Sequence, residues 1–146
     1  MRIARGDFEI DDDWERQDKA FLVEAILNSY WGEFLDEAQL LRSFENSVAF
    51  GIYEQGGPQV GCARVVTDFT RFAWLSDVYV DPAFQGQGLG RWLMDTIVSY
   101  DDFRQVSRWV LATKDAHALY AEFGFERADP DRMMTMTPFA RPESSE

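Results

Sequence analysis

Apolar and polar residues change their spacing several times along the chain, and each change marks the start of a new element. Residues 1–10 partly alternate in polarity, which indicates an edge strand. Apolar residues at helical spacing then predict a first helix over residues 14–29, with Asp12 as its N-cap. A break at Gly32 precedes a shorter predicted helix over residues 34–44.

Strand patterns dominate the middle of the chain. Residues 47–54, 59–67 and 72–80 are apolar runs bounded by turn signals, of which the glycines and proline at 56–58 are the strongest. Three consecutive strands joined by short turns predict an antiparallel meander.

The last third of the chain returns to helical spacing. A stripe of apolar residues predicts a helix after the meander, and its members are Leu89, Trp92, Leu93, Ile97 and Tyr100. A strand over residues 106–112 and a helix over 116–123 are expected next, with Gly124 as the C-terminal cap of that helix. A final strand is expected over residues 132–137.

The order of these elements predicts an α+β (mixed α/β) fold, in which helices flank a central, mostly antiparallel sheet. A chain of 146 residues, 46% of them hydrophobic, suits a single domain, which we place at residues 1–140, with residues 141–146 as a tail. No apolar run has the length of a membrane span, and the N-terminus lacks a signal-peptide pattern. We therefore expect a cytoplasmic protein with no membrane partner.

Acidic residues outnumber basic ones by 26 to 14, which gives a formal charge of −12. This balance argues against nucleic acid as a partner, because nucleic-acid affinity comes mostly from cationic contacts to phosphate. It is compatible with a cationic substrate, or with an acidic surface that serves solubility alone. One cysteine, Cys62, and one histidine are too few soft ligands to indicate a metal site or a disulfide framework.

Three glycines fall within five positions where the third meander strand meets the following helix. A helix that starts on glycines presents unsatisfied backbone N–H groups at the positive end of its dipole, where phosphate commonly binds. The segment does not match a nucleoside-triphosphate loop, because Gly90 is followed by Arg91 and Trp92 rather than by Lys and Ser or Thr. It does not match the dinucleotide fingerprint either, since the sixth position from Gly86 is Arg91.

The segment fits the pattern Gln/Arg-x-x-Gly-x-Gly/Ala, and it reads Gln85-Gly86-Gln87-Gly88-Leu89-Gly90. Placed after a strand, it closely resembles the acetyl-coenzyme A (acetyl-CoA) segment of the GCN5-related N-acetyltransferases. The run Ala116-x-x-Leu119-Tyr120-x-x-x-Gly124-Phe125 resembles the second signature of that family. The order of elements agrees over most of the chain, so the resemblance implies that family's fold, with central strands that splay apart.

The resemblance also implies where acetyl-CoA would bind. Backbone groups would hold its diphosphate at Gln85, Gly86, Gln87, Gly88, Leu89, Gly90 and Arg91. The pantetheine arm would lie along Val78, Tyr79 and Val80 like a further strand, and a main-chain N–H near Val80 would polarise the thioester carbonyl.

Tyr120 is the candidate acid for the departing thiolate, because the family commonly uses a tyrosine in this helix. Its hydroxyl is expected to point inward, since Tyr120 shares an apolar helical face with Leu119 and Phe123. A core tyrosine bonded to a backbone carbonyl is the alternative. One position departs from the family: Thr113 stands where an asparagine often contacts the cofactor arm.

Asp77 is the second catalytic candidate, either as a general base or as an anchor for a cationic substrate. Strand alternation would put its carboxylate on one face with Leu75 and Tyr79, where a charge needs a partner. A short turn would bring Arg64 close on the neighbouring strand, so a structural Asp77–Arg64 ion pair is an equally strong interpretation.

Three aromatic residues, Tyr30, Trp31 and Phe34, lie where this fold usually builds part of the acceptor wall. Tyr30 and Trp31 are candidate substrate-binding residues, and the Trp31 ring could hold a cation; alternatively, all three close the core under the helix pair. Histidine as a residue type suits acid–base chemistry, but His117 lies outside the family motif, so a solvated helix face is the favoured interpretation.

The predicted function is an N-acetyltransferase that moves acetyl from acetyl-CoA to a primary amine by direct attack in a ternary complex. A small, cationic acceptor is the expected partner, and a homodimer is left open. The alternative is a regulatory or sensor domain of the same fold that binds acyl-CoA without turnover.

Overall fold

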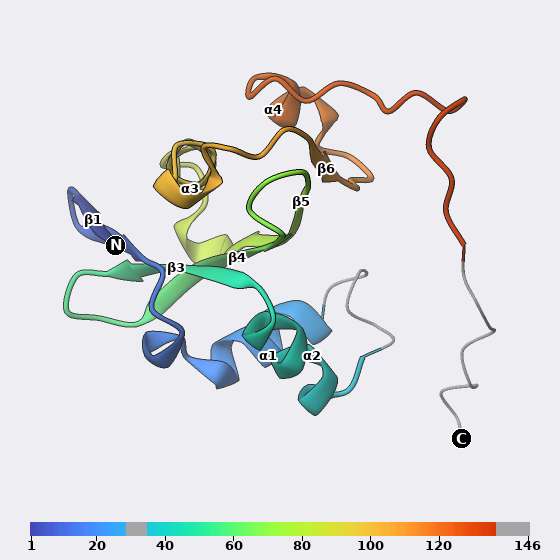
Figure 1. The fold of residues 1–146 in the computed structure, drawn as a ribbon. Coiled ribbons are helices and arrows are strands. Elements are labelled where there is room, and N and C mark those ends of the chain that lie inside the picture. The colour runs from blue at the N-terminus through green and yellow to red at the C-terminus, as the bar shows by residue number, and fades with distance from the viewer. Residues whose placement is uncertain (29–34, 137–146) are drawn as a thin grey trace. The chain divides into compact units, whose positions relative to one another are not determined.

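The computed structural model describes residues 1–28 and 35–136, which fall into two compact units, Met1–Ala112 and Thr113–Glu146. The first unit is built on a six-stranded sheet with the strands in chain order, β1 to β6 (Figure 1). Neighbouring strands are antiparallel except for β5 and β6, which are parallel. The predicted α+β class and mostly antiparallel sheet are confirmed. The single domain over residues 1–140 stays a prediction.

The sheet begins with a hairpin where one strand was predicted. β1 spans Arg2–Arg5 and β2 spans Phe8–Asp11, joined at Gly6, whose φ of 59° lies in the left-handed region. Gln55 braces the turn, because its side-chain Nε2 donates to the Gly6 carbonyl at 2.7 Å. The prediction of a single strand over residues 1–10 is therefore wrong, since a glycine turn reverses the chain within it.

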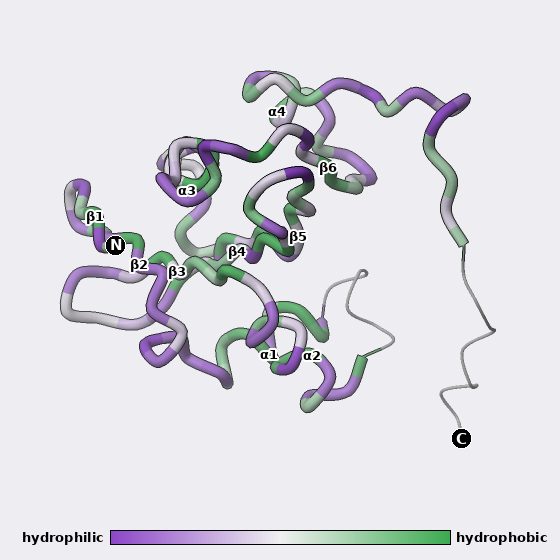
Figure 2. Tube along the Cα trace, viewed as in Figure 1, coloured by the Kyte–Doolittle hydropathy of each residue, from purple (hydrophilic) through white to green (hydrophobic). Residues whose placement is uncertain are grey.

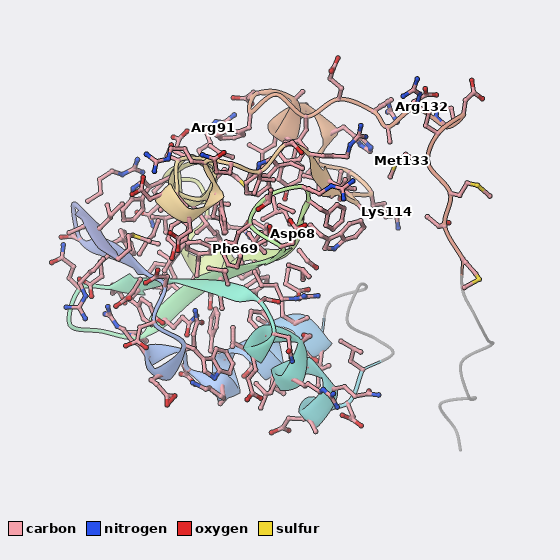
Figure 3. All side chains as sticks on the ribbon, viewed as in Figure 1. Asp68, Phe69, Arg91, Lys114, Arg132 and Met133 are labelled. Atoms are coloured by element: carbon pink, nitrogen blue, oxygen red, sulfur yellow. The ribbon has the colours of Figure 1, made fainter. Side chains whose placement is uncertain are left out.

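The meander follows the prediction closely. β3 spans Val48–Glu54, β4 spans Gln59–Thr67 and β5 spans Ala73–Val80. Asp68, labelled in Figure 3, organises the β4–β5 turn. Its carboxylate accepts hydrogen bonds from the backbone N–H groups of Thr70 and Arg71 at 3.0 and 2.8 Å. These hydrogen bonds hold the pKa of the Asp68 carboxyl below its ordinary value.

The first predicted helix is divided in two by successive aspartate caps. Asp13 caps a 3₁₀ helix over Trp14–Arg16, and Asp18 caps α1, which spans Lys19–Leu27. The predicted N-cap at Asp12 was wrong, because the side chains of Asp13 and Asp18 accept the N–H groups at the two helix starts instead. The second helix, α2, spans Glu37–Glu45 behind a capping box of Asp36 and Gln39, later than the predicted 34–44.

Helices cover both faces of the sheet in the first unit (Figure 1). The face under α1 and α2 carries a buried cluster of Leu22, Ala25, Ile26, Leu40, Phe44, Ala49 and Cys62. The opposite face is covered by α3, Leu89–Val98, which buries Leu93, Met94 and Ile97. Figure 2 shows the hydrophobic residues concentrated along the strands and on α1 and α3. The predicted apolar stripe of α3 is thus the surface that packs on the sheet.

The last strand of the sheet, β6, is short. It spans Trp109–Leu111, within the predicted 106–112, and follows a 3₁₀ helix over Asp101–Phe103. Within the described parts of the chain, no helix combines the length and apolar character of a membrane span.

The second unit contains α4, His117–Ala121, shorter than the predicted 116–123. Its end is capped as predicted: Gly124 has a φ of 96°, and the N–H groups of Gly124 and Phe125 donate to the Ala121 and Tyr120 carbonyls at 3.1 and 3.2 Å. This is a Schellman motif.

The strand predicted over residues 132–137 is not found within residues 132–136, and residue 137 lies outside the described part. A turn at Asp129 takes the N–H groups of Arg132 and Met133, each at 3.0 Å, instead of a strand ladder.

Candidate active site

The sheet opens at the end of β5. Strand β5 pairs with β4 as far as Val80, but it pairs with β6 only over Ala73–Leu75, so Ser76–Val80 continue past the partner. The Asp81 N–H donates to the Val60 carbonyl of β4 at 2.8 Å. Because successive N–H groups of a strand point to opposite sides, the Val80 N–H points away from β4, towards the opening. Val78–Val80 therefore have the splayed geometry that the resemblance implies.

A β-bulge lies inside this stretch of β5. The register changes from Arg64↔Ser76 to Cys62↔Tyr79, so that Asp77 and Val78 both stand opposite one residue of β4. Asp77 takes a φ of 55°, a left-handed conformation that aspartate tolerates better than most residues. The bulge also resets the alternation. Tyr79 packs on the cluster under α1 and α2, as does its partner Cys62.

The bulge corrects one expectation about the faces of the strand. Ser76 pairs with Arg64, whose guanidinium lies 5.8 Å from the Phe44 ring on the helix side, so its neighbour Leu75 faces the other way. Leu75 therefore does not share a face with Tyr79. A sequence pattern of period two has no means of showing an inserted residue.

Asp77 is held in a buried ion pair. Its Oδ2 lies 2.6 Å from Arg64 Nε, and the exposed fractions of the two side chains are 5% and 16%. Arg64 also donates to the hydroxyls of Ser47 and Ser76, at 3.2 and 3.4 Å. The ion pair that the sequence analysis set beside catalysis is present. A role for Asp77 in proton removal stays a proposal.

The glycine segment follows a short 3₁₀ helix, Pro82–Phe84, which Asp81 caps. Two glutamines fold the loop back on itself. Gln85 Nε2 donates to the Val80 carbonyl at 2.9 Å, and Gln87 Nε2 donates to the Phe84 carbonyl at 3.1 Å. These two side chains stabilise the loop through backbone carbonyls, while the Gln85 N–H donates to the Pro82 carbonyl at 3.4 Å.

Two glycines of the segment are left-handed. Gly86 and Gly88 have φ values of 87° and 81°, and Gly88 is the N-cap of α3 without a side-chain acceptor for the first turn. The first N–H with an intrahelical partner belongs to Trp92, which donates to the Gly88 carbonyl at 3.0 Å. The N–H groups before it form the positive end of the helix dipole.

The space around the segment suits an anion. A Cβ placed on Gly86 or Gly90 would meet no heavy atom within 4 Å, so a ligand can approach the backbone there. Arg91, exposed at the start of α3 and labelled in Figure 3, adds a positive charge. The seven predicted residues from Gln85 to Arg91 thus form the entry to this helix start, a type of site that suits a phosphate group, and their contact with the diphosphate of acetyl-CoA stays a prediction.

Tyr120 lies on α4 in the second unit, half-buried, with its ring edge-to-face on Phe125 at 6.1 Å between centroids. The structure does not define its distance from the glycine segment. Thr113, the departure from the family, accepts the Ala116 N–H on its hydroxyl at 3.1 Å and so prepares the start of α4. His117 is exposed at the first position of that helix, as expected of a solvated face.

Two predicted substrate-binding residues, Tyr30 and Trp31, lie outside the described residues, and so does Phe34. Among the described residues, the Tyr79 ring packs edge-to-face on Phe21 of α1 with 6.0 Å between centroids. Burial raises the pKa of Tyr79, and the negative charges of Asp81 and Glu24 act in the same direction. The Tyr79 phenol therefore stays protonated beside acidic groups.

One contact of the glycine segment was not predicted from the sequence. Arg5, at the end of β1, donates from Nη2 to the Gly88 carbonyl at 3.3 Å. The contact joins residues 83 positions apart, so no local pattern could have predicted it.

Comparison with known proteins identifies the family. Residues 46–127 match the model described as the acetyltransferase (GNAT) domain. A crystal structure from Xanthomonas campestris pv. campestris, described as belonging to the GNAT family, superposes with a TM-score of 0.86 and 31% identity, covering 92% of this chain and 95% of that one. An acetyltransferase structure from Clostridium acetobutylicum, described as containing acetyl-CoA, shares the fold at 17% identity, with a TM-score of 0.65, covering 89% of this chain and 94% of that one.

Among curated proteins, histone acetyltransferase TAP1 of Glycine max is 31% identical over 127 residues, 84% of this chain. The chain spans about half the length of this relative, 50%. The matched region of the family model includes the meander, the glycine segment and α4. The chain therefore belongs to the GNAT family of acetyltransferases.

Proposed function

We propose that the protein is an N-acetyltransferase that moves an acetyl group from acetyl-CoA to a primary amine by direct attack in a ternary complex. The observation that carries the proposal is the start of α3: a helix capped by a left-handed glycine, with no side-chain cap and with open space above the backbone. The GNAT family uses acetyl-CoA, and these donors suit its diphosphate.

The open end of β5 is where the chemistry would occur. The Val80 N–H, directed away from β4, would donate to the thioester oxygen as negative charge develops on it during attack by the amine. Gln85 donates to the Val80 carbonyl at 2.9 Å and so holds the next peptide, Val80–Asp81, at the entrance to the loop directly after the donor. A donor fixed before the reaction costs no reorganisation when the charge appears.

Tyr120 is the proposed proton donor to the departing thiolate. The Schellman motif behind it anchors its helix turn, because the Tyr120 carbonyl accepts N–H groups from Phe123 and Phe125 at 3.0 and 3.2 Å. Such an anchor holds the backbone of Tyr120 in place, and the contact with Phe125 restricts its ring, which suits a catalytic acid.

A small cationic acceptor is the proposed substrate class. The net charge of −12 attracts cations, and the acidic Glu24 and Asp81 act on Tyr79 beside the end of β5. A protein acceptor is the second candidate, because the soybean relative is named a histone acetyltransferase.

Thiol release from acetyl-CoA, measured with a broad panel of amines and followed by mass measurement of the products, tests the function. We expect one acetyl group, 42 Da, on the acceptor and none without enzyme. The panel should include monoamines, diamines, amino acids and a lysine-rich peptide. Binding of acetyl-CoA with no acetylated product from any of them would favour the sensor alternative.

Replacing Tyr120 with Phe tests the acid. The change keeps the ring contact with Phe125 and removes the hydroxyl, so kcat should fall roughly ten- to a thousandfold while acetyl-CoA affinity changes little. Phe123→Leu, a change on the same helix turn, is the matched control for packing. A Tyr120→Phe enzyme with the wild-type kcat would make Tyr120 a core residue.

A further inference from the structure

The N-terminal hairpin contacts the glycine segment and the residues on either side of it. Before the segment, the Phe8 ring of β2 packs edge-to-face on Phe84 with 6.0 Å between centroids. Within the segment, Arg5 of β1 donates to the Gly88 carbonyl at 3.3 Å, and directly after it the Arg5 guanidinium carbon lies 4.8 Å from the centre of the Trp92 ring. The hairpin therefore brings a cation to the start of α3.

Arg5 differs from the neighbouring arginines in its interaction partners. Arg2 and Arg16 both form ion pairs with Glu9 and Asp11. Across residues 1–28 and 35–136, no carboxylate lies within ion-pair distance of Arg5. Its side chain is exposed, and a neutral carbonyl accepts its one hydrogen bond among these residues. Within the described part of a chain of net charge −12, this positive charge therefore has no carboxylate partner.

The position of Arg5 is fixed while most of its donors remain available. A guanidinium has five N–H donors, and the bond to Gly88 uses one of them. The Trp92 ring lies under the planar group and limits its movement. A Cβ built on Gly88 would lie 3.6 Å from Arg5 Nη2, so an anion at the Gly88 backbone is within reach of the same side chain.

We propose that Arg5 contacts the diphosphate of coenzyme A, so that the N-terminal hairpin completes the phosphate site begun by the glycine segment. The inference rests on the proposed function, because it requires acetyl-CoA at the start of α3. Planar, paired N–H donors suit phosphate oxygens, which gives arginine an advantage over a point charge at such a site.

The competing explanation is a structural one, in which Arg5 only ties the hairpin to α3. The two explanations predict different effects of removing the Arg5 side chain. Loss of a phosphate contact would weaken only the use of acetyl donors that carry the diphosphate. Loss of a structural tie would weaken the use of every acetyl donor equally and would lower the thermal stability of the protein.

The experiment compares Arg5→Gln with three acetyl donors in steady-state kinetics: acetyl-CoA, acetyl-dephospho-CoA, which lacks the 3′-phosphate, and S-acetylpantetheine, which has no phosphate. We expect kcat/KM for Arg5→Gln to fall about tenfold with the first two donors and to be unchanged with the third. With acetyl-CoA, KM should rise while kcat is retained. Arg5→Lys, which keeps the charge, should recover part of the loss.

Arg104→Gln is the matched control, because it also removes one positive charge, from an exposed i,i+3 pair with Asp101. It should leave all three donors unchanged, which separates a local contact from the effect of net charge. An equal loss with S-acetylpantetheine, a loss confined to the donor with the 3′-phosphate, or no loss at all would each overturn the assignment of Arg5.

Measurements on the wild-type protein separate a failure of the proposed function from a failure of the role of Arg5. If wild-type enzyme neither binds acetyl-CoA in calorimetry nor releases thiol with any amine, the proposed function fails and the role of Arg5 fails with it. If wild type binds and turns over while Arg5→Gln matches it, only the role of Arg5 fails.

Discussion

The glycine segment and the Asp77 bulge are two irregular stretches of backbone only a few residues apart, and they differ in how their polar groups are satisfied. Both contain left-handed residues, at Gly86 and Gly88 in one and at Asp77 in the other. At the bulge, the charged group is buried and paired with Arg64 at 2.6 Å. At the glycine segment, the helix start is exposed and carries no side-chain cap.

The difference indicates which stretch is built for a ligand. A buried charge is stable only when it is paired, so the Asp77–Arg64 contact is explained by the fold alone. A helix that starts without a cap leaves N–H groups that water or a ligand must satisfy. The bulge therefore needs no ligand to explain it, and the glycine segment is the stretch to which we assign one under the proposed function.

Arg64→Met should have the largest effect, and it should act on stability. The change leaves the Asp77 carboxylate buried without its cation, so we expect the free energy of unfolding to drop by about 3 kcal/mol. Urea denaturation measures it. Combining Arg64→Met with Asp77→Asn should cost less than Arg64→Met alone, because the double variant buries no unpaired charge. A stable Arg64→Met protein would show that the pair is dispensable to the fold.

Gly90→Val should act on the ligand instead. Gly90 has no heavy atom within 4 Å of its Cβ position and no left-handed φ, so the fold accepts a side chain there. The valine would cover the helix start, and acetyl-CoA affinity should weaken about thirtyfold, as expected from losing the contacts of a helix N-terminus. Calorimetric titration measures the Kd.

Gly90→Ala is the size-matched control for that change, because alanine is allowed at this position of the family pattern, and it should bind nearly as tightly as wild type. Gly88 is less suitable, since a φ of 81° would strain any replacement and mix backbone strain with lost binding. Wild-type affinity in Gly90→Val would place the diphosphate elsewhere.

Any acidic groups that face the acceptor should have a smaller effect, which is seen as a dependence of kcat/KM on salt concentration. If acidic groups near the end of β5 attract the acceptor, kcat/KM for the best cationic amine should fall about two- to fivefold as salt rises, at saturating acetyl-CoA. A glutamate-like amine of similar size should show no such fall. Equal rates for lysine-like and glutamate-like acceptors at low salt would assign the −12 charge to solubility.

Asp77→Asn should have the smallest effect of these changes on turnover. It tests whether the bulge has only a structural role. The Asp77 carboxylate is buried and bonded to Arg64, so its structural role is already explained and we expect kcat to stay within about threefold of wild type. The pH–rate profile is the decisive measurement. A hundredfold lower kcat, together with loss of the ionisation that activates the enzyme as pH rises, would identify Asp77 as the general base.

The parts of the molecule that sequence reasoning predicted are those with local signals. The meander and the glycine start of α3 have strand alternation, turn residues and a helical stripe within a few positions of each other. The Gly124 cap was predictable for the same reason, because a left-handed helix end selects glycine.

The parts it missed depend on partners that are distant in the chain or on an inserted residue. The bulge at Asp77 follows from the β4–β5 register, which alternation along one strand does not contain. The Arg5–Gly88 contact joins the first hairpin to α3. The strand expected from residue 132 failed because an extended pattern needs a neighbour, and a turn at Asp129 took the first N–H groups.

The missing side-chain cap of α3 has a thermodynamic consequence. Asp18 and Asp36 satisfy the starts of α1 and α2 with their side chains at all times, whereas the left-handed Gly88 leaves that stabilisation of α3 to be supplied from solution. If acetyl-CoA binds there, linkage ties folding to its concentration: a ligand at a hundred times its Kd adds about 2.7 kcal/mol to the unfolding free energy. The melting temperature and protease resistance of the protein would then rise with the concentration of acetyl-CoA around it.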